Sequence, residues 1–132
     1  MSIIIITNNP KVFQKFNGKY EIEYLENESY LDVLLMVRDK LHKGHKLLSH
    51  PLSGSVKPNE TPFKSILISQ KKGKIDFGSL SILENSIATY EKFIKIKRLP
   101  DWNQDVVVDF MVVDLSLLEN TLVNIEFTEL LE

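Results

Sequence analysis

Three histidines lie within a run of nine residues, and three imidazole groups are a number that catalytic zinc sites use. They are His42, His45 and His50. His42 falls in the last turn of an expected helix, where a cationic side chain is stabilised without any metal. An expected strand of four residues would separate His45 from His50 by about 13 Å at 3.3 Å per residue. We therefore predict no metal site.

The segment from His50 to Pro62, HPLSGSVKPNETP, combines prolines with small polar residues. Ser53, Gly54 and Ser55 place two hydroxyl groups around a residue that lets a ligand approach the backbone closely, and Lys57 adds a positive charge. These are ingredients of an anion-binding loop, although no Walker A or G-x-G-x-x-G sequence accompanies them. The alternative is a connection that prolines stiffen and polar side chains satisfy. A structureless connection of about 15 residues favours a functional role.

His50 is the candidate for acid–base catalysis, because an imidazole titrates near neutral pH. Ser53 or Ser55 would be a nucleophile if a base oriented its hydroxyl group. The sequence contains no G-x-S-x-G elbow, and no carboxylate can be assigned as an orienting partner from spacing alone. We expect a protein that is not an enzyme. A small enzyme that acts on a phosphorylated or amino-acid-derived metabolite, with His50 as acid or base, stays as the alternative.

The composition of the chain limits its function classes. Its 132 residues fit a single domain, predicted over residues 1–132, and 43% hydrophobic residues support an ordered core. The 16 basic and 18 acidic residues show none of the basic excess that nucleic-acid binding requires. Without cysteine, the chain carries no disulfide, thiolate metal site or thiol redox chemistry, and we expect no cofactor. The N-terminus resembles neither a signal peptide nor a membrane span, so we expect a cytoplasmic protein.

Hydrophobic periodicity predicts alternating strands and helices. The expected strands are residues 3–6, 20–24, 46–49 and 65–69, and the expected helices are residues 10–16, 29–43 and a segment from about residue 79. Ser29 and Asp32 are expected to cap the second helix, and Gly44 to end it. Its apolar stripe is wide between Tyr30 and Val37, so the helix is either buried on two sides or covered in a homodimer.

The last 30 residues have a mixed pattern. Two valine-rich runs, at 106–108 and 111–113, have high strand propensity, but Asp109 and Asp114 interrupt them. We predict a short helix after Asp101 and another that starts near Asp114. A strand around residues 110–113 is the alternative.

This order of elements predicts one three-layer α/β domain with a small, mostly parallel sheet, Rossmann-like or flavodoxin-like, and a helical C-terminus. In such sheets ligands bind beyond the carboxyl ends of the strands. Polar residues follow the first strand there, and the proline-rich segment follows the third. The predicted ligand-binding residues are Asn8, Asn9, His50, Ser53, Gly54, Ser55, Lys57 and Asn59.

The run LDVLLMVRDKLHKGHKLLSHPLSGSVKPNETPFKSI, residues 31–66, resembles the signature segment of the GrdX family. The part HPLSGSVKPNETP is the most specific, and the N-terminal strand that ends in Thr-Asn-Asn-Pro is also similar. The resemblance implies a small protein encoded beside glycine reductase components in amino-acid-fermenting anaerobic bacteria, and it implies no catalytic residues. We therefore expect an accessory or regulatory protein that binds a small anionic ligand or a glycine reductase component through residues 50–62.

Overall fold

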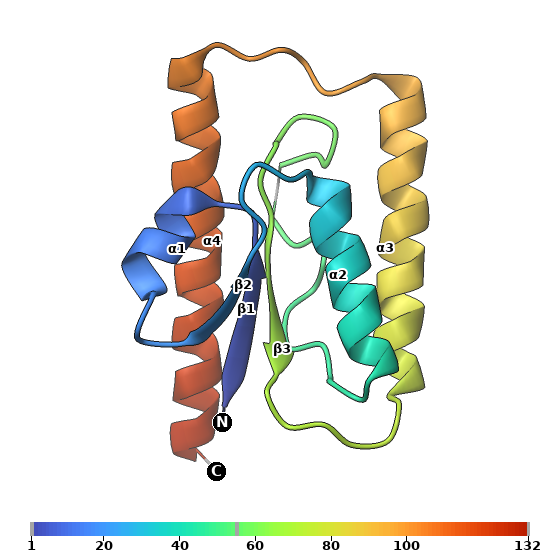
Figure 1. Cartoon of the computed structure of the whole chain (residues 1–132), viewed down its shortest axis with the longest axis vertical. Coiled ribbons are helices and arrows are strands. Elements are labelled where there is room, and N and C mark those ends of the chain that lie inside the picture. The colour runs from blue at the N-terminus through green and yellow to red at the C-terminus, as the bar shows by residue number, and fades with distance from the viewer. Residues whose placement is uncertain (1, 55, 132) are drawn as a thin grey trace.

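The protein, as a computed structural model, is described for residues 2–54 and 56–131, which form a small sheet between two pairs of helices (Figure 1). The elements are β1 (Ile3–Thr7), α1 (Pro10–Phe16), β2 (Glu21–Tyr24), α2 (Tyr30–His42), β3 (Ser65–Ser69), α3 (Phe77–Ile96) and α4 (Gln104–Leu131). Helices α1 and α4 cover one face of the sheet, and α2 and α3 cover the other. The predicted α/β class with a helical C-terminus is confirmed.

The sheet is mixed, whereas the sequence predicts a mostly parallel one. Its strand order is β2-β1-β3, with β1 parallel to β2 and antiparallel to β3. In this register Ser65 at the start of β3 lies opposite Thr7 at the end of β1. The chain therefore enters β3 at the edge where it leaves β1. The residues after β1 therefore lie beside the proline-rich connection, as predicted. They lie beside the end of that connection, where it enters β3, and not beside its start.

Residues 46–49 do not form the predicted strand. They run antiparallel beside β3, with one isolated bridge between Leu47 and Ile68. The backbone N–H of Leu48 donates to the carbonyl of Leu67 at 2.8 Å, but the next donor, Leu67 N–H, is taken by Ser49 Oγ at 2.9 Å. A serine hydroxyl thus replaces a backbone carbonyl, and the ladder cannot continue.

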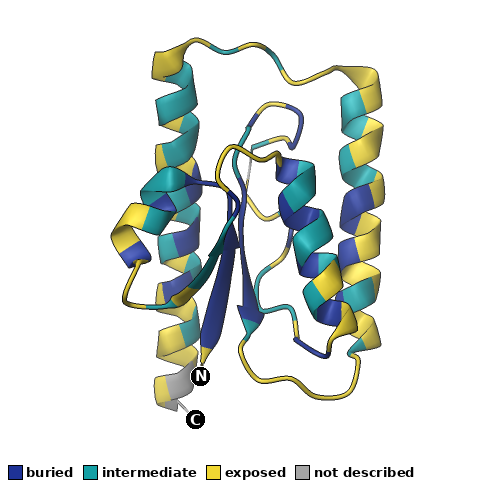
Figure 2. Cartoon of the chain, viewed as in Figure 1, coloured by how far each residue is buried: buried dark blue, intermediate teal, exposed yellow. Residues whose placement is uncertain are grey.

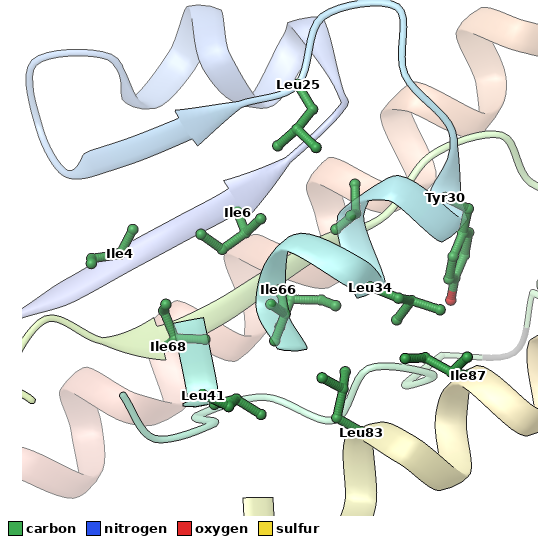
Figure 3. Close-up of a cluster of buried hydrophobic side chains, with 12 residues drawn as sticks. Ile4, Ile6, Leu25, Tyr30, Leu34, Leu41, Ile66, Ile68, Leu83 and Ile87 are labelled. Atoms are coloured by element: carbon green, nitrogen blue, oxygen red, sulfur yellow. The ribbon is translucent and has the colours of Figure 1, made fainter. Parts of the chain in front are cut away.

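Strand β1 is buried on both faces, as its four isoleucines predict (Figure 2). Because side chains alternate along a strand, Ile4 and Ile6 face α2 and α3, while Ile3 and Ile5 face α1 and α4. Figure 3 shows the first of these cores, in which side chains of β1 and β3 meet those of the two helices. The second core is completed by Val12, Phe16, Leu67, Leu118 and Leu122.

Helix α2 has the predicted capping box at its start. Ser29 Oγ accepts from the Asp32 N–H at 3.1 Å, and Asp32 Oδ2 accepts from the Ser29 N–H at 2.9 Å. The apolar face between Tyr30 and Val37 packs against the sheet and α3 of the same chain. The two-sided burial of this helix explains its wide stripe, so the stripe gives no reason to expect a homodimer through this face.

The C-terminal segment is one helix of 28 residues, α4, and not the two short helices or the strand considered from the sequence. Asn103 Oδ1 accepts from the Val106 N–H near its start at 3.0 Å, which suits an N-terminal cap. Asp114 does not interrupt the helix, because its carboxylate accepts hydrogen bonds from β3 and from Asn9 instead of from nearby backbone. Among the described residues, no helix combines the length and the apolar character needed to cross a membrane.

Candidate functional site

A buried polar cluster lies where β1 ends, β3 begins and α4 passes. It consists of Thr7, Asn9, Ser65 and Asp114, all at most 7% exposed. Asp114 Oδ2 accepts from Ser65 Oγ at 2.7 Å and from Asn9 Nδ2 at 3.0 Å, and its Oδ1 accepts from the Ser65 N–H at 3.1 Å. The cluster therefore fastens α4 to the edge of the sheet.

The hydrogen bonds of the cluster form a chain in which each hydroxyl group donates toward Asp114. Thr7 Oγ1 accepts from the Asn9 N–H at 3.0 Å and lies 2.7 Å from Ser65 Oγ. Because Ser65 Oγ donates its proton to Asp114, the Thr7 hydroxyl must donate to Ser65. The chain of donors thus ends on the Asp114 carboxylate, which accepts three hydrogen bonds. A carboxylate is the group that this arrangement of donors suits.

Lys64 brings a buried positive charge next to this cluster. Only 5% of the residue is exposed, and its Nζ donates to Ser53 O at 3.2 Å and to Ser53 Oγ at 3.4 Å. No carboxylate of the described residues lies within salt-bridge distance of it. Burial lowers the pKa of Lys64, and the charge of Asp114 opposes this shift. The ammonium group is therefore held beneath Ser53 by neutral acceptors.

Asp114 of the cluster and the neighbouring Tyr30 also have shifted pKa values. Burial raises the pKa of Asp114, while the hydrogen bonds from Asn9 and Ser65 and the charge of Lys64 oppose that rise. Burial also raises the pKa of Tyr30, and the charges of Asp114 and Tyr90 act in the same direction. Buried titratable groups with shifted pKa values are typical of functional sites, although structural networks produce them too.

The predicted residues after β1 use their amide groups within the chain. Asn8 Nδ2 donates to Glu28 O and to Pro62 O, both at 2.9 Å, and its Oδ1 accepts from the Lys64 N–H at 2.9 Å. Asn9 caps α1, and its Nδ2 donates to Asp114 and to Met111 O. Asn8 therefore joins the end of β1 to the end of the 50–62 loop.

The 50–62 loop is fastened at several further points. Its anchoring hydrogen bonds are Tyr30 Oη to Pro51 O at 3.1 Å, Asn59 Nδ2 to Phe93 O and to Lys97 O at 3.2 Å each, and Trp102 Nε1 to Glu60 O at 2.7 Å. Pro51, Pro58, Asn59 and Thr61 are buried. The loop is thus attached to α2, α3, β1 and the segment before α4, which agrees with a stiff connection.

Other predicted loop residues face the solvent. Ser53, Gly54 and Lys57 are exposed, and Ser55 lies outside the described residues. Gly54 has a φ of +103°, and a Cβ atom there would lie 2.7 Å from Leu117 Cδ1 of α4. The left-handed backbone therefore favours glycine at this position, and a Cβ atom would displace the end of the Leu117 side chain.

The three histidines are separated in the structure. His45 is buried, and its Nδ1–H donates to Ser69 O at 2.7 Å. His50 is exposed, and its Nδ1 accepts from the Leu52 N–H at 3.0 Å, so in the neutral ring the proton resides on Nε2. His42 is exposed at the end of α2. Among the described residues, no three histidine or carboxylate side chains are grouped to hold a metal ion.

The cavities beneath the 50–62 loop are much smaller than the grooves that border residues 46–49. Two cavities of about 10 Å³ each border Lys64 and Asp114 beneath the loop, enough for roughly one water molecule each. Two open grooves of about 390 Å³ each border the segment 46–49. One is lined by His50, Asp76 and Ser79, and the other by Lys46, Lys71 and Lys72.

Comparison with known proteins supplies the family. The model of the GrdX-like protein family matches residues 4–123, which cover β1 to the last third of α4. The chain belongs to the GrdX-like protein family. The match to this family extends well beyond the 31–66 segment that carries the resemblance in the sequence. Neither a curated protein nor a solved structure matches the chain.

The centre of this GrdX-like site was not among the residues predicted from the sequence. Asp114, Ser65 and Lys64 come together only because α4 crosses the edge at which β1 and β3 meet. One signal was present: Asp114 interrupts an apolar run that would otherwise read as fully buried. A charged residue at a core position of a helix indicates a buried polar partner.

Proposed function

We propose that this GrdX-like protein is an accessory protein of the glycine reductase system, and that it binds a small anion or an anionic surface of a partner through the 50–62 loop. The observation that supports this most is that the loop is anchored at both ends and in its middle, while Ser53, Gly54 and Lys57 remain exposed. A loop held in one conformation loses little entropy when it binds, so its exposed groups are pre-organised.

Two lysines near Ser53 support an anion as the ligand. Lys57 supplies an exposed ammonium group, and Lys64 supplies a buried one directly beneath Ser53. Gly54 is exposed beside Ser53 and adds no side chain between a ligand and the loop. Within the proposal, Asn8 and Asn59 position the loop, Asn9 holds α4 beside it through Asp114, and His50, Ser53, Ser55 and Lys57 contact the ligand. Glycine reductase components are proposed as partners because the family resemblance implies that context.

Titration with inorganic phosphate and with acetate tests the proposal. We expect either anion to raise the free energy of unfolding, by about 2.7 kcal/mol at a concentration of 100 times its Kd. Lys57→Ala should remove this response and change stability by less than about 0.5 kcal/mol, because the side chain is exposed. The control is Lys19→Ala, also exposed but on the turn before β2, which should respond like the wild type.

Two results would contradict this site. An equal response of wild type and Lys57→Ala would place the anion elsewhere, and no response of the wild type to either anion would remove the small-ligand part of the proposal. In that second case, capture of purified glycine reductase components on the immobilised wild type, weakened by Lys57→Ala, would retain the partner part. Failure of capture as well would overturn the binding function.

A second candidate function is supported by the groove beside the loop. His50 and Asp76 line the same groove of about 390 Å³, which places an imidazole and a carboxylate at one concave surface. Asp76 Oδ2 accepts from Ser79 Oγ at 2.6 Å and from the Ser79 N–H at 3.2 Å, and these bonds lower its pKa. An imidazole and a carboxylate at one concave surface are side chains that acid–base catalysis uses.

The enzyme alternative predicts a specific loss. If a screen of phosphorylated and amino-acid-derived metabolites finds turnover, His50→Ala should lower kcat by about 100-fold or more, as removal of a general acid or base does. The control is His42→Ala. His42 is also exposed but lies at the end of α2, so its replacement should leave kcat unchanged. Turnover that persists in His50→Ala would exclude His50 as the acid or base.

A further inference from the structure

Helix α4 exposes a row of large apolar side chains on the face that points away from the sheet. Val123, Phe127 and Leu130 are 62%, 60% and 85% exposed and follow one another at i, i+4 and i+7, so they lie on one face. Val112, 47% exposed, lies on the same face three turns earlier. Leu118 and Leu122 face the core instead. We call Val112, Val123, Phe127 and Leu130 the outer stripe.

The charge of α4 limits what can cover the outer stripe. Residues 104–131 contain six acidic residues and no lysine, arginine or histidine. Asp105 and Asp109 are exposed at one end of the stripe. Two α4 helices that packed against each other would bring acidic groups together, and like charges in contact disfavour an interface. The charges therefore favour an occupant that carries basic groups around apolar ones.

The end of α3 has these properties. Ile96 is 80% exposed and Leu99 is 41% exposed, and they lie among basic residues. The set Lys92, Lys95, Ile96, Lys97, Arg98 and Leu99 is called here the basic end. None of its lysine and arginine side chains forms a salt bridge with a described residue. Its apolar and charged groups are therefore both available for a contact between molecules.

Within one chain the two surfaces cannot meet. Figure 1 shows α3 and α4 on opposite sides of the sheet, with the basic end and the C-terminal end of α4 at opposite ends of the molecule. We propose that the basic end of one copy binds the outer stripe of a second copy. Such a contact joins two different surfaces, so it is head-to-tail and leaves one of each surface free for further copies. This proposal does not rest on the anion site in the 50–62 loop.

Analytical ultracentrifugation of the full chain tests this contact from micromolar to millimolar concentration. We expect the wild type to form species larger than a dimer as the concentration rises, and added salt to weaken them because charges contribute. Ile96→Glu, which blocks the basic end, and Phe127→Lys, which blocks the outer stripe, should each be monomeric. Mixed in equal amounts, the two variants should form a dimer and no larger species, since each retains one intact surface.

The substituted residues are exposed, so both variants should fold, which thermal unfolding monitored by circular dichroism checks. Asn85→Glu, an exposed position in the middle of α3, is the matched control and should associate like the wild type. A wild type that stays monomeric at all concentrations would overturn the proposal. So would a dimer that Phe127→Lys abolishes and Ile96→Glu does not, because that result indicates symmetric pairing through α4.

Discussion

Replacement of Gly44 by alanine is expected to lower the free energy of unfolding by about 3 to 5 kcal/mol, as left-handed backbone strain and steric overlap each cost about 1 to 3 kcal/mol. Gly44 follows α2 with a φ of +102°, which side chains rarely adopt. A Cβ atom at this position would lie 2.2 Å from the carbonyl oxygen of Gly73. Because that oxygen belongs to the backbone, the overlap can be relieved only if the turn at Gly44 and the turn at Gly73 move apart.

The contact that Gly44 permits joins the end of α2 to the turn after β3. The Gly73 N–H donates to the Gly44 carbonyl at 3.0 Å, and the separation of the two turns would strain this hydrogen bond. Urea unfolding monitored by circular dichroism measures the loss.

Gly18→Ala separates the two causes of the Gly44 effect. Gly18 has a φ of +87° but no heavy atom within 4 Å of a Cβ at that position. We expect it to lose only the conformational part, about 1 to 2 kcal/mol. If the two variants lost the same stability, the steric contact with Gly73 would not contribute.

Replacement of Asp114 by alanine is expected to cost about 3 to 5 kcal/mol, the range found when one partner of a buried charged group is removed. The Ser65 N–H and Oγ and the Asn9 Nδ2 would lose an acceptor at a buried site. Lys64, only 5% exposed, would also lose the nearby negative charge that offsets its burial. The attachment of α4 to the sheet edge would weaken, and urea unfolding would report the loss.

Asp109→Ala is the matched control, because Asp109 is exposed on the same helix. We expect it to change stability by less than about 0.5 kcal/mol. If the two variants lost the same free energy of unfolding, the hydrogen bonds of the buried cluster would not contribute to the attachment of α4.

The pH dependence of stability tests the charge of Asp114 separately. Burial raises the pKa of Asp114 above its ordinary value of 3.8, so the folded state binds the proton more tightly than the unfolded state does. Stability from this group is therefore complete below pH 3.8 and is lost as the pH rises through the raised pKa. Relative to Asp114→Asn, which lacks the titrating group, the wild type should lose stability with rising pH in that window. A relative gain would contradict the raised pKa.

Local features of the sequence were sufficient for most of the elements. Four consecutive isoleucines predicted a strand buried on both faces, and β1 has that environment. Ser29 and Asp32 predicted the capping box of α2, and Pro10 predicted the start of α1. These features depend on side-chain periodicity and on contacts between residues at most four positions apart, which a sequence displays directly.

Three features differ from the prediction, and each depends on contacts between residues that are distant in the sequence. Ser49 Oγ took a donor of β3 and ended the pairing of residues 46–49 as a strand. The valine-rich runs joined a single helix once Asp114 found its donors in Asn9 and Ser65. The antiparallel direction of β3 follows from the return of the 50–62 loop to the edge where β1 ends.

The sequence by itself determined the α/β class, the first strand, the helix caps, the family resemblance and the presence of a proline-rich polar loop. Tertiary structure decided which of the predicted polar residues are buried and which are exposed. Asn8, Asn9 and Asn59 use their amide donors on carbonyl and carboxylate oxygens far away in the chain, while His50, Ser53 and Lys57 remain exposed. Sequence spacing cannot show this, because a buried donor is satisfied by whichever acceptor the packing of the helices brings to it.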